Sequence, residues 1–182
     1  MDFTKLNMIK DSQNSSENIE TPLNKSENDN QCSECNQIIT LWCRSCISKR
    51  FQQDFDKWTS GNERIDEFIQ GSKLEAINNY NVMEWVPYNR LRNVQYFAKG
   101  CSGTIYYAIW LDGNIQTWNN KEQNWERRTD PLKELDHENA KKVGFKSPLK
   151  ENENRGCRVT LENLKDSSKI HKVFLNKVSF SL

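Results

Sequence analysis

The sequence predicts an α+β fold in which a twisted antiparallel sheet with one helix follows a small helical region and a four-cysteine module. Three observations support this prediction. Residues 94–110 form two apolar runs, rich in aromatic and β-branched side chains, that are joined by a glycine-containing turn. Four cysteines stand in two C-x-x-C pairs within residues 32–46. Residues 47–80 repeat apolar side chains at helical spacing.

Charge and composition argue against several classes of protein. The 26 basic and 25 acidic residues leave a net charge of +1, so no overall field attracts nucleic acid or an anionic membrane. No apolar run is long enough to span a bilayer, and the first residues lack the apolar core of a secretory signal. We therefore expect an intracellular, cytoplasmic protein without membrane contact, whose six cysteines are reduced thiols or metal ligands.

Residues 1–31 are predicted to form a disordered polar leader. Between residues 11 and 30, only Ile19, Pro22 and Leu23 interrupt a run of polar and charged side chains. Such a segment buries too little apolar surface to offset the entropy lost on ordering. A solvated tail and a short docking motif are both consistent with this composition.

The cysteine pairs predict a zinc module at residues 32–46. Each pair can present two thiolates to one tetrahedral ion, and four thiolates complete its coordination sphere, as in a structural site. The predicted ligands are Cys32, Cys35, Cys43 and Cys46. The seven residues between the pairs are fewer than in the common four-cysteine pattern, so unligated thiols and a disulfide or redox pair remain alternatives. Two further cysteines stand apart and are predicted to be ordinary thiols: Cys101 and Cys157.

Residues 47–80 are predicted to be a helical region between the cysteine module and the sheet. One helix face is indicated by apolar residues three and four positions apart: Ile47, Phe51, Phe55 and Trp58. A second helix is indicated by a similar set: Ile65, Phe68, Ile69, Ala76 and Ile77. Ser60 and Glu63 have the spacing of a capping box for this second helix. We interpret both apolar faces as core.

Residues 81–182 contain the predicted sheet. In the turn of its first hairpin, Gly100 and Gly103 would let backbone amides approach a bound phosphate closely, although a plain hairpin explains the same glycines. A second hairpin is predicted after the Asp112–Gly113 turn signal. The polar residues 127–155 are predicted to be a mobile insertion. A strand at 158–164 and an amphipathic helix at 167–178 are expected to follow.

The order of these elements resembles the N-terminal lobe of protein kinases, in which a glycine-rich hairpin precedes a strand bearing lysine and a helix bearing glutamate. More closely, the chain from about Cys32 onward resembles a large, expanded family of fungal protein kinases with a cysteine-rich opening. The matching motifs lie at residues 84–88, 98–100, 103–106, 108–110, 112–113 and 174–176. The resemblance implies a kinase-like N-lobe with one αC-like helix.

The resemblance also implies a nucleotide site on the first hairpin. The three loop glycines of the family fall on Ala98, Gly100 and Gly103, and the positions that enclose adenine fall on Phe97, Ile105 and Thr160. The whole implied set is Phe97, Ala98, Lys99, Gly100, Cys101, Ser102, Gly103, Ile105 and Thr160. The alternative is that these side chains only fill the core of the sheet.

Two charges that kinases need for ATP are exchanged in this chain. A kinase holds the α- and β-phosphates with a strand lysine, which a helix glutamate orients. Here the resemblance places Glu162 at the lysine position and Lys177 at the glutamate position. A carboxylate about 4 Å from a phosphate oxygen repels it by roughly 4 kcal/mol at an effective dielectric of 20. We expect weak or no ATP binding and a reversed ion pair between these two residues, with independent loss of an unused site as the alternative.

The resulting expectation is a kinase-like N-lobe fragment without catalytic activity, acting as a pseudokinase-type module that binds a protein partner. Self-association through the exposed lobe face is expected as well. The catalytic base and magnesium ligands of kinases lie on a C-terminal lobe that this sequence does not include. One alternative is an incomplete portion of an ATP-dependent protein kinase whose C-lobe lies outside this chain. Another is a zinc-dependent nucleic-acid-binding protein, which the near-neutral charge disfavours.

Overall fold

The computed structural model of the chain is of the α+β class, with antiparallel sheets and a few short helices. It describes residues 6–9, 31–39, 42–100 and 103–164. The chain divides into two compact units, one of residues 12–83 and the other of residues 1–11 together with 84–182.

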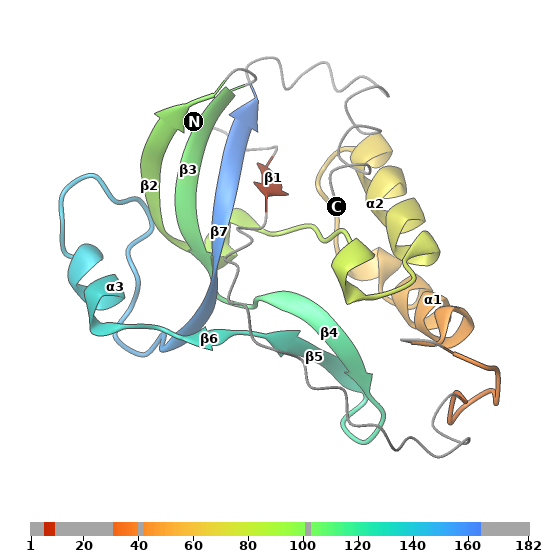
Figure 1. Cartoon of the computed structure of the whole chain (residues 1–182). Coiled ribbons are helices and arrows are strands. Elements are labelled where there is room, and N and C mark those ends of the chain that lie inside the picture. The colour runs from red at the N-terminus through yellow and green to blue at the C-terminus, as the bar shows by residue number, and fades with distance from the viewer. Residues whose placement is uncertain (1–5, 10–30, 40–41, 101–102, 165–182) are drawn as a thin grey trace. The chain divides into compact units, whose positions relative to one another are not determined.

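The unit of residues 12–83 is built on two helices. Helix α1 spans Arg44–Gln52 and α2 spans Glu63–Glu75, with 3₁₀ turns at Phe55–Lys57 and Asn79–Asn81. The two helices pack side by side (Figure 1). The buried apolar side chains of this pair are Ile47, Phe51, Ile65 and Ile69, and Ala76, the residue after α2, is buried as well. These are among the residues whose spacing predicts the helices.

The first helix is shorter than its apolar spacing predicts. It ends at Gln52, and a tight turn follows in which the Asp54 amide donates to the Phe51 carbonyl at 3.1 Å. Asp54 also binds the ammonium group of Lys57, three residues on, at 2.7 Å. Trp58 therefore follows this turn and does not lie on the helix face.

The start and end of α2 also differ from the prediction. Asn62, not Ser60, caps the helix, because its side chain accepts hydrogen bonds from the backbone amides of Arg64 and Ile65. The Ser60 hydroxyl donates to the Asn62 carbonyl instead. The helix ends at Glu75, so Ile77 lies beyond it and is 60% exposed.

The second unit contains an antiparallel sheet with strand order β1-β7-β3-β2 (Figure 1). The strands are β1 (Leu6–Ile9), β2 (Leu91–Lys99), β3 (Gly103–Trp110) and β7 (Arg155–Leu164), and the short β6 (Asp130–Pro131) also pairs with β7. The hairpin predicted over residues 94–110 is thus β2 and β3. Its core cluster consists of Val86, Leu91, Val94, Ala108, Trp110, Val159 and Leu161.

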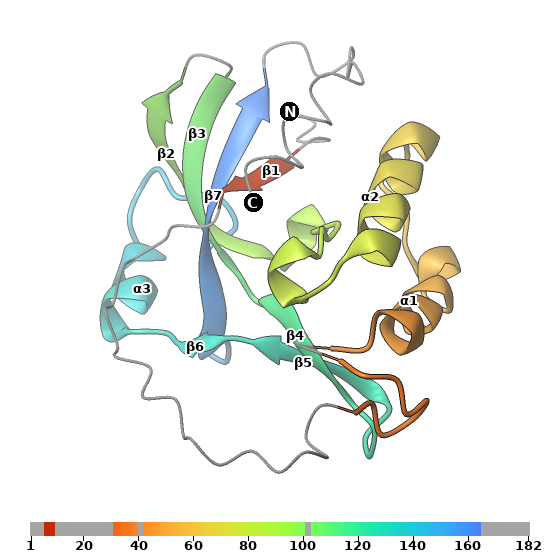
Figure 2. The same ribbon diagram turned by 45° about the vertical axis from the view of Figure 1, so that its right-hand side comes forward.

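Strand β1 corrects the prediction of a leader without structure at residues 1–31. Leu6–Ile9 pairs antiparallel with β7, with Met8 opposite Leu161 and Ile9 opposite Thr160 (Figure 2). Three of its four residues are apolar. The prediction rests on the polar composition of residues 11–30, which follow this strand in the sequence. Residues 10–30 lie outside the described part of the chain.

Strands β4 (Asn114–Asn119) and β5 (Asn124–Arg128) form a separate two-stranded sheet, the second predicted hairpin. Trp118 and Trp125 face each other across it, with ring centroids 5.1 Å apart. The hairpin begins after Gly113, whose φ is +64° and whose hydrogen points at the Arg128 carbonyl. A Cβ there would lie 1.8 Å from that oxygen, so only glycine fits this turn.

The polar segment 127–155 has more structure than the predicted mobile insertion. It contains the end of β5, strand β6 and helix α3 (Glu134–Asn139). The buried Asn93 side chain donates to the Asp136 carbonyl at 2.7 Å and accepts from the Leu149 amide at 2.9 Å. These bonds join the segment to β2, and composition alone did not indicate them because the apolar share of the segment is small.

Candidate metal centre

The first cysteine pair lies on a tight turn. Gln31 and Ile38 form an antiparallel bridge at its base. Within the turn, the Cys32 amide donates to the Gln37 carbonyl and the Asn36 amide donates to the Cys32 carbonyl, both at 2.8 Å. Asn36 adopts a φ of 57°, a left-handed conformation that asparagine tolerates better than most residues. This turn presents the thiols of Cys32 and Cys35 together.

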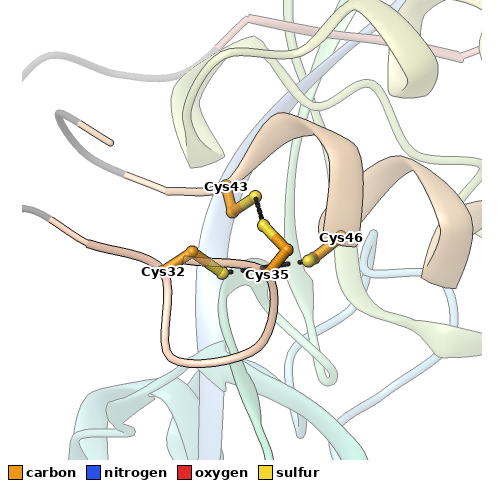
Figure 3. A group of neighbouring side chains, drawn as sticks. All are labelled: Cys32, Cys35, Cys43 and Cys46. Atoms are coloured by element: carbon orange, nitrogen blue, oxygen red, sulfur yellow. Dashed lines mark hydrogen bonds between the residues drawn. The ribbon is translucent and has the colours of Figure 1, made fainter. Parts of the chain in front are cut away.

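The second pair lies at the start of α1. Cys43 is the residue before the helix, and its carbonyl accepts a hydrogen bond from the Ile47 amide at 2.9 Å. Cys46 is the third residue of the helix. Figure 3 shows the turn and the helix start presenting the four side chains toward one another.

The separations of the sulfur atoms fit a tetrahedral metal ion. All four lie within 4.8 Å of one another. Cys32 and Cys46 are 3.8 Å apart, and Cys35 and Cys43 are 3.4 Å apart (Figure 3). Zinc–sulfur bonds of about 2.3 Å in a tetrahedron place sulfurs roughly 3.8 Å apart, whereas a disulfide needs about 2.05 Å. The cluster therefore has the ligand set and spacing of a structural metal site such as zinc.

The four thiols differ in exposure and in acidity. Cys32 and Cys43 are each 6% exposed, Cys46 is half-buried and Cys35 is exposed. The Glu34 backbone amide lowers the pKa of Cys32 to about 7, although burial opposes this. Burial raises the pKa of Cys46, and the neighbouring sulfurs add to the effect. The Gln37 amide acts to lower the pKa of Cys35, but the Cys43 sulfur and burial raise it overall. A bound cation would offset the electrostatic repulsion among the four thiolates.

Polar contacts fix the cysteine turn and α1 to their surroundings. The Arg50 guanidinium binds the Glu34 carboxylate at 2.5 Å, which joins the helix to the turn. Arg44 and Ser48 both donate to the Leu74 carbonyl, at 3.2 and 3.1 Å, so α1 is also tied to the end of α2. The spacing of the cysteines predicts the centre itself. Nothing in the sequence indicates the Glu34–Arg50 contact, because the two residues are far apart in the chain.

The helix pair also buries a cation. Lys73 of α2 is 8% exposed, and its ammonium group lies 4.8 Å from the centre of the Trp58 ring and 5.5 Å from that of Phe51. Aromatic faces attract a cation at these distances. Trp58 therefore contributes to this unit from outside the helix.

Three of the residues that the resemblance assigns to a nucleotide, Ala98, Ile105 and Thr160, share one face of the larger sheet. The register pairs Ile105 with Glu162, and Tyr107 with Thr160. Directly opposed side chains lie on the same face and alternate residues repeat it, so Ile105, Thr160 and Glu162 lie together. Ala98 pairs with Ile105 on this face.

Two aromatic side chains on this face are exposed. The ring centroids of Phe97 and Tyr107 lie 4.3 Å apart, and these two residues are 53% and 40% exposed. Gly100 donates its amide to the Gly103 carbonyl at 2.8 Å, which closes the turn. The sequence prediction did not include Tyr107, although alternation along β3 would have placed it beside Ile105.

Several predicted residues lie outside the described part of the chain. These are Cys101, Ser102, Lys177 and the expected helix at 167–178. Lys99 pairs with Thr104 and thus lies on the other face of the sheet from Ile105. Cys157 is on β7, opposite Trp110, in the other unit from the four-cysteine cluster.

Comparisons with known proteins give no relative. No family model, no curated protein and no solved structure matches the chain. Among the described residues, no helix has the length and apolar character needed to cross a membrane.

Proposed function

We propose that the chain holds one structural zinc ion through Cys32, Cys35, Cys43 and Cys46, and that it serves as a kinase-like, non-catalytic binding module. The observation that carries the zinc proposal is the approach of all four sulfur atoms to within 4.8 Å of one another. Four thiolates fill the tetrahedral sphere of zinc and leave no position for a substrate or a reactive water. The ion would stabilise the fold and take no part in a reaction.

Zinc at this position would connect two parts of the chain. The 31–38 turn has one backbone bridge of its own, and its connection to α1 includes the Glu34–Arg50 pair. With side chains 13% and 36% exposed, this partly exposed pair contributes only about 0–1 kcal/mol to stability. The metal would supply most of the free energy that holds the turn against the helix, because binding and folding are coupled in small metal modules.

The kinase-like part of the proposal is supported by the shared face of the sheet. Phe97 packs on Tyr107, and Ile105 and Thr160 lie on the same face as Tyr107, as a site for an adenine ring requires. Glu162 lies on this face too, where the resemblance calls for a lysine. Its carboxylate would repel phosphate, and Lys177 would pair with it as a reversed copy of the kinase lysine–glutamate pair. ATP binding is therefore weak or absent, and phosphoryl transfer is not supported.

A binding role fits the exposed aromatic residues at the end of the β2–β3 hairpin. Phe97 and Tyr107, whose rings are in contact, are 53% and 40% exposed. Exposed aromatic groups of this kind are typical of surfaces that contact other proteins. A protein partner or a second copy of the chain would bind there, and the near-neutral net charge of +1 offers no comparable feature for nucleic acid.

Thermal unfolding of the purified protein tests both parts of the proposal. A zinc chelator should lower the melting temperature, and magnesium-ATP should shift it little. Glu162→Lys should increase the ATP-dependent shift, because it replaces phosphate repulsion with attraction. Glu151→Lys, the same charge change at an exposed position, is the matched control and should not.

Three results would contradict the proposal. If the purified protein contains no metal and its melting temperature does not change with chelator, the proposal of a zinc site is wrong. If ATP shifts the melting temperatures of Glu162→Lys and Glu151→Lys equally, position 162 does not face a bound nucleotide. Labelled ATP should transfer no phosphate to a generic substrate above background, and transfer that scales with purified protein would overturn the non-catalytic role.

A further inference from the structure

We propose that Cys35 is a site of oxidation by hydrogen peroxide, and that Cys43 converts the oxidised Cys35 to a disulfide with release of the zinc. This inference rests on the proposed zinc site and adds its regulation. The carrying observation is the unequal exposure of the four sulfur ligands. Cys35 is exposed to solvent, whereas Cys32 and Cys43 are each 6% exposed and Cys46 is half-buried.

Exposure selects Cys35 as the first sulfur that an oxidant meets. Peroxide must approach a sulfur lone pair directly, so oxidation of a thiolate depends on its access to solvent. Cys32 and Cys35 come from the 31–38 turn and Cys43 from the residue before α1, and of these three only Cys35 is exposed (Figure 3). This difference in exposure is a property of the folded 31–38 turn and of the start of α1.

The position of Cys43 makes it the partner for the second step. Its sulfur lies 3.4 Å from that of Cys35, within a cluster whose four sulfurs lie within 4.8 Å of one another. A sulfenic acid at Cys35 would thus meet the Cys43 thiolate with little movement of the backbone. The contraction needed to form the bond is modest, because a disulfide is about 2.05 Å long.

The chemistry balances in two steps. The Cys35 thiolate attacks one oxygen of peroxide, the O–O bond breaks, and one proton is taken up to give a sulfenic acid and water. The Cys43 thiolate then attacks the Cys35 sulfur, and the hydroxide that leaves takes a second proton to form water. Peroxide gains two electrons and each sulfur loses one. Zinc is left with two thiolates and dissociates.

Oxidation would thus release the metal while the two segments that carry its ligands stay covalently linked. The new bond would link the cysteine turn to the residue before α1, so the turn would remain attached to the helix. Cys32 and Cys46 would become ordinary thiols. A reductant would restore the original ligand set, because a disulfide is the reversible stage of cysteine oxidation.

Cysteine mapping of the zinc-loaded protein gives the first test. The protein is treated with limiting peroxide, its remaining thiols are alkylated, and trypsin is added. Cleavage after Lys25, Arg44 and Lys49 leaves three of the cysteines on peptide 26–44 and Cys46 on peptide 45–49. The expected product is an internal disulfide in peptide 26–44, with alkylated Cys32 and Cys46, formed in step with zinc release.

Two histidine variants give a matched second test. Three cysteines and one histidine also form a structural zinc site, so Cys35→His and Cys46→His should both retain the metal. Cys35→His removes the exposed sulfur, and its zinc should be released about tenfold more slowly by peroxide. Cys46→His keeps both reacting sulfurs and should release zinc as fast as the unmodified chain.

The outcomes separate this inference from the zinc proposal. Protein that contains no zinc before oxidation overturns both. Zinc-loaded protein that forms mainly a disulfide between Cys32 and Cys46, seen as a cross-link between the two peptides, overturns the oxidation inference alone. Equal zinc-release rates for zinc-loaded Cys35→His and Cys46→His overturn it too.

Discussion

Arg92 and Glu153 form a nearly buried ion pair between β2 and the polar segment before β7. The Arg92 guanidinium donates to the Glu153 carboxylate at 3.0, 2.8 and 2.7 Å, and the two side chains are 11% and 14% exposed. Arg92 also donates to the Asn89 and Leu91 carbonyls. The Lys150 amide is a further donor to Glu153. A segment of polar composition is thus joined to the sheet by a satisfied charge pair.

Glu153→Gln should lower the free energy of unfolding by about 3 kcal/mol, because removing one charge of a buried pair leaves the other uncompensated. Chemical denaturation followed by circular dichroism measures the change. Glu151→Gln, an exposed position in the same turn, should stay within about 0.5 kcal/mol of the original chain. Equal effects of the two substitutions would show that the pair does not stabilise the segment.

Stability should fall in acid. Arg90 lowers the pKa of Asp112, and at Glu153 the Arg92 and Lys150 contacts outweigh burial and lower the pKa below its ordinary 4.5. Carboxyls with depressed pKa values stabilise the fold above their ordinary pKa and lose this contribution as the pH falls through the folded value. Unfolding free energies measured between about pH 6 and pH 2.5 should decrease below about pH 4.5. Asp112→Asn with Glu153→Gln should flatten the slope, and an unaltered slope would refute this assignment.

Two glycine-to-alanine substitutions should change the free energy of unfolding in opposite directions. Gly113→Ala should cost at least about 2 kcal/mol, because φ is +64° and the new Cβ would lie 1.8 Å from the Arg128 carbonyl oxygen. Gly71→Ala lies inside α2 with no atom within 4 Å of its Cβ, and should add about 1 kcal/mol. Thermal unfolding measures both. A gain in stability from Gly113→Ala would be incompatible with the observed turn.

The cap of α2 is testable with two neighbouring residues. Asn62→Ala should cost about 1 kcal/mol, since its side chain accepts from two backbone amides. Ser60→Ala should cost less, because the Ser60 hydroxyl bonds to Asn62 and not to the helix amides. Helix content and unfolding midpoints distinguish the two. A larger effect at Ser60 would favour the capping box that the sequence suggests.

The sequence predicts the elements whose signal is local. Four cysteines in paired spacing predict the cluster, and β-branched and aromatic runs around Gly100 predict β2 and β3. The apolar spacing in α1 and α2 predicts both helices, although it extends α1 to Trp58, which lies beyond a tight turn. The α+β class, with an antiparallel sheet and short helices, is confirmed.

The features that were missed depend on contacts between distant residues. The Asn93 side chain bonds to Asp136 and Leu149, 43 and 56 residues away, and no local pattern marks these partners. Strand β1 exists through pairing with β7 at the other end of the chain. Composition describes the average environment of a segment and does not indicate a few buried polar groups with partners elsewhere.

X-ray absorption at the zinc edge, on protein purified without chelator, tests the central claim most directly. About one zinc per chain, surrounded by four sulfur atoms at about 2.3 Å, is the predicted result. Cys157→Ser should leave this spectrum unchanged, because Cys157 lies on β7 and outside the cluster. Cys43→Ser should replace one sulfur neighbour with oxygen or abolish binding. Protein without zinc, or zinc with oxygen and nitrogen neighbours in the original chain, would contradict the account.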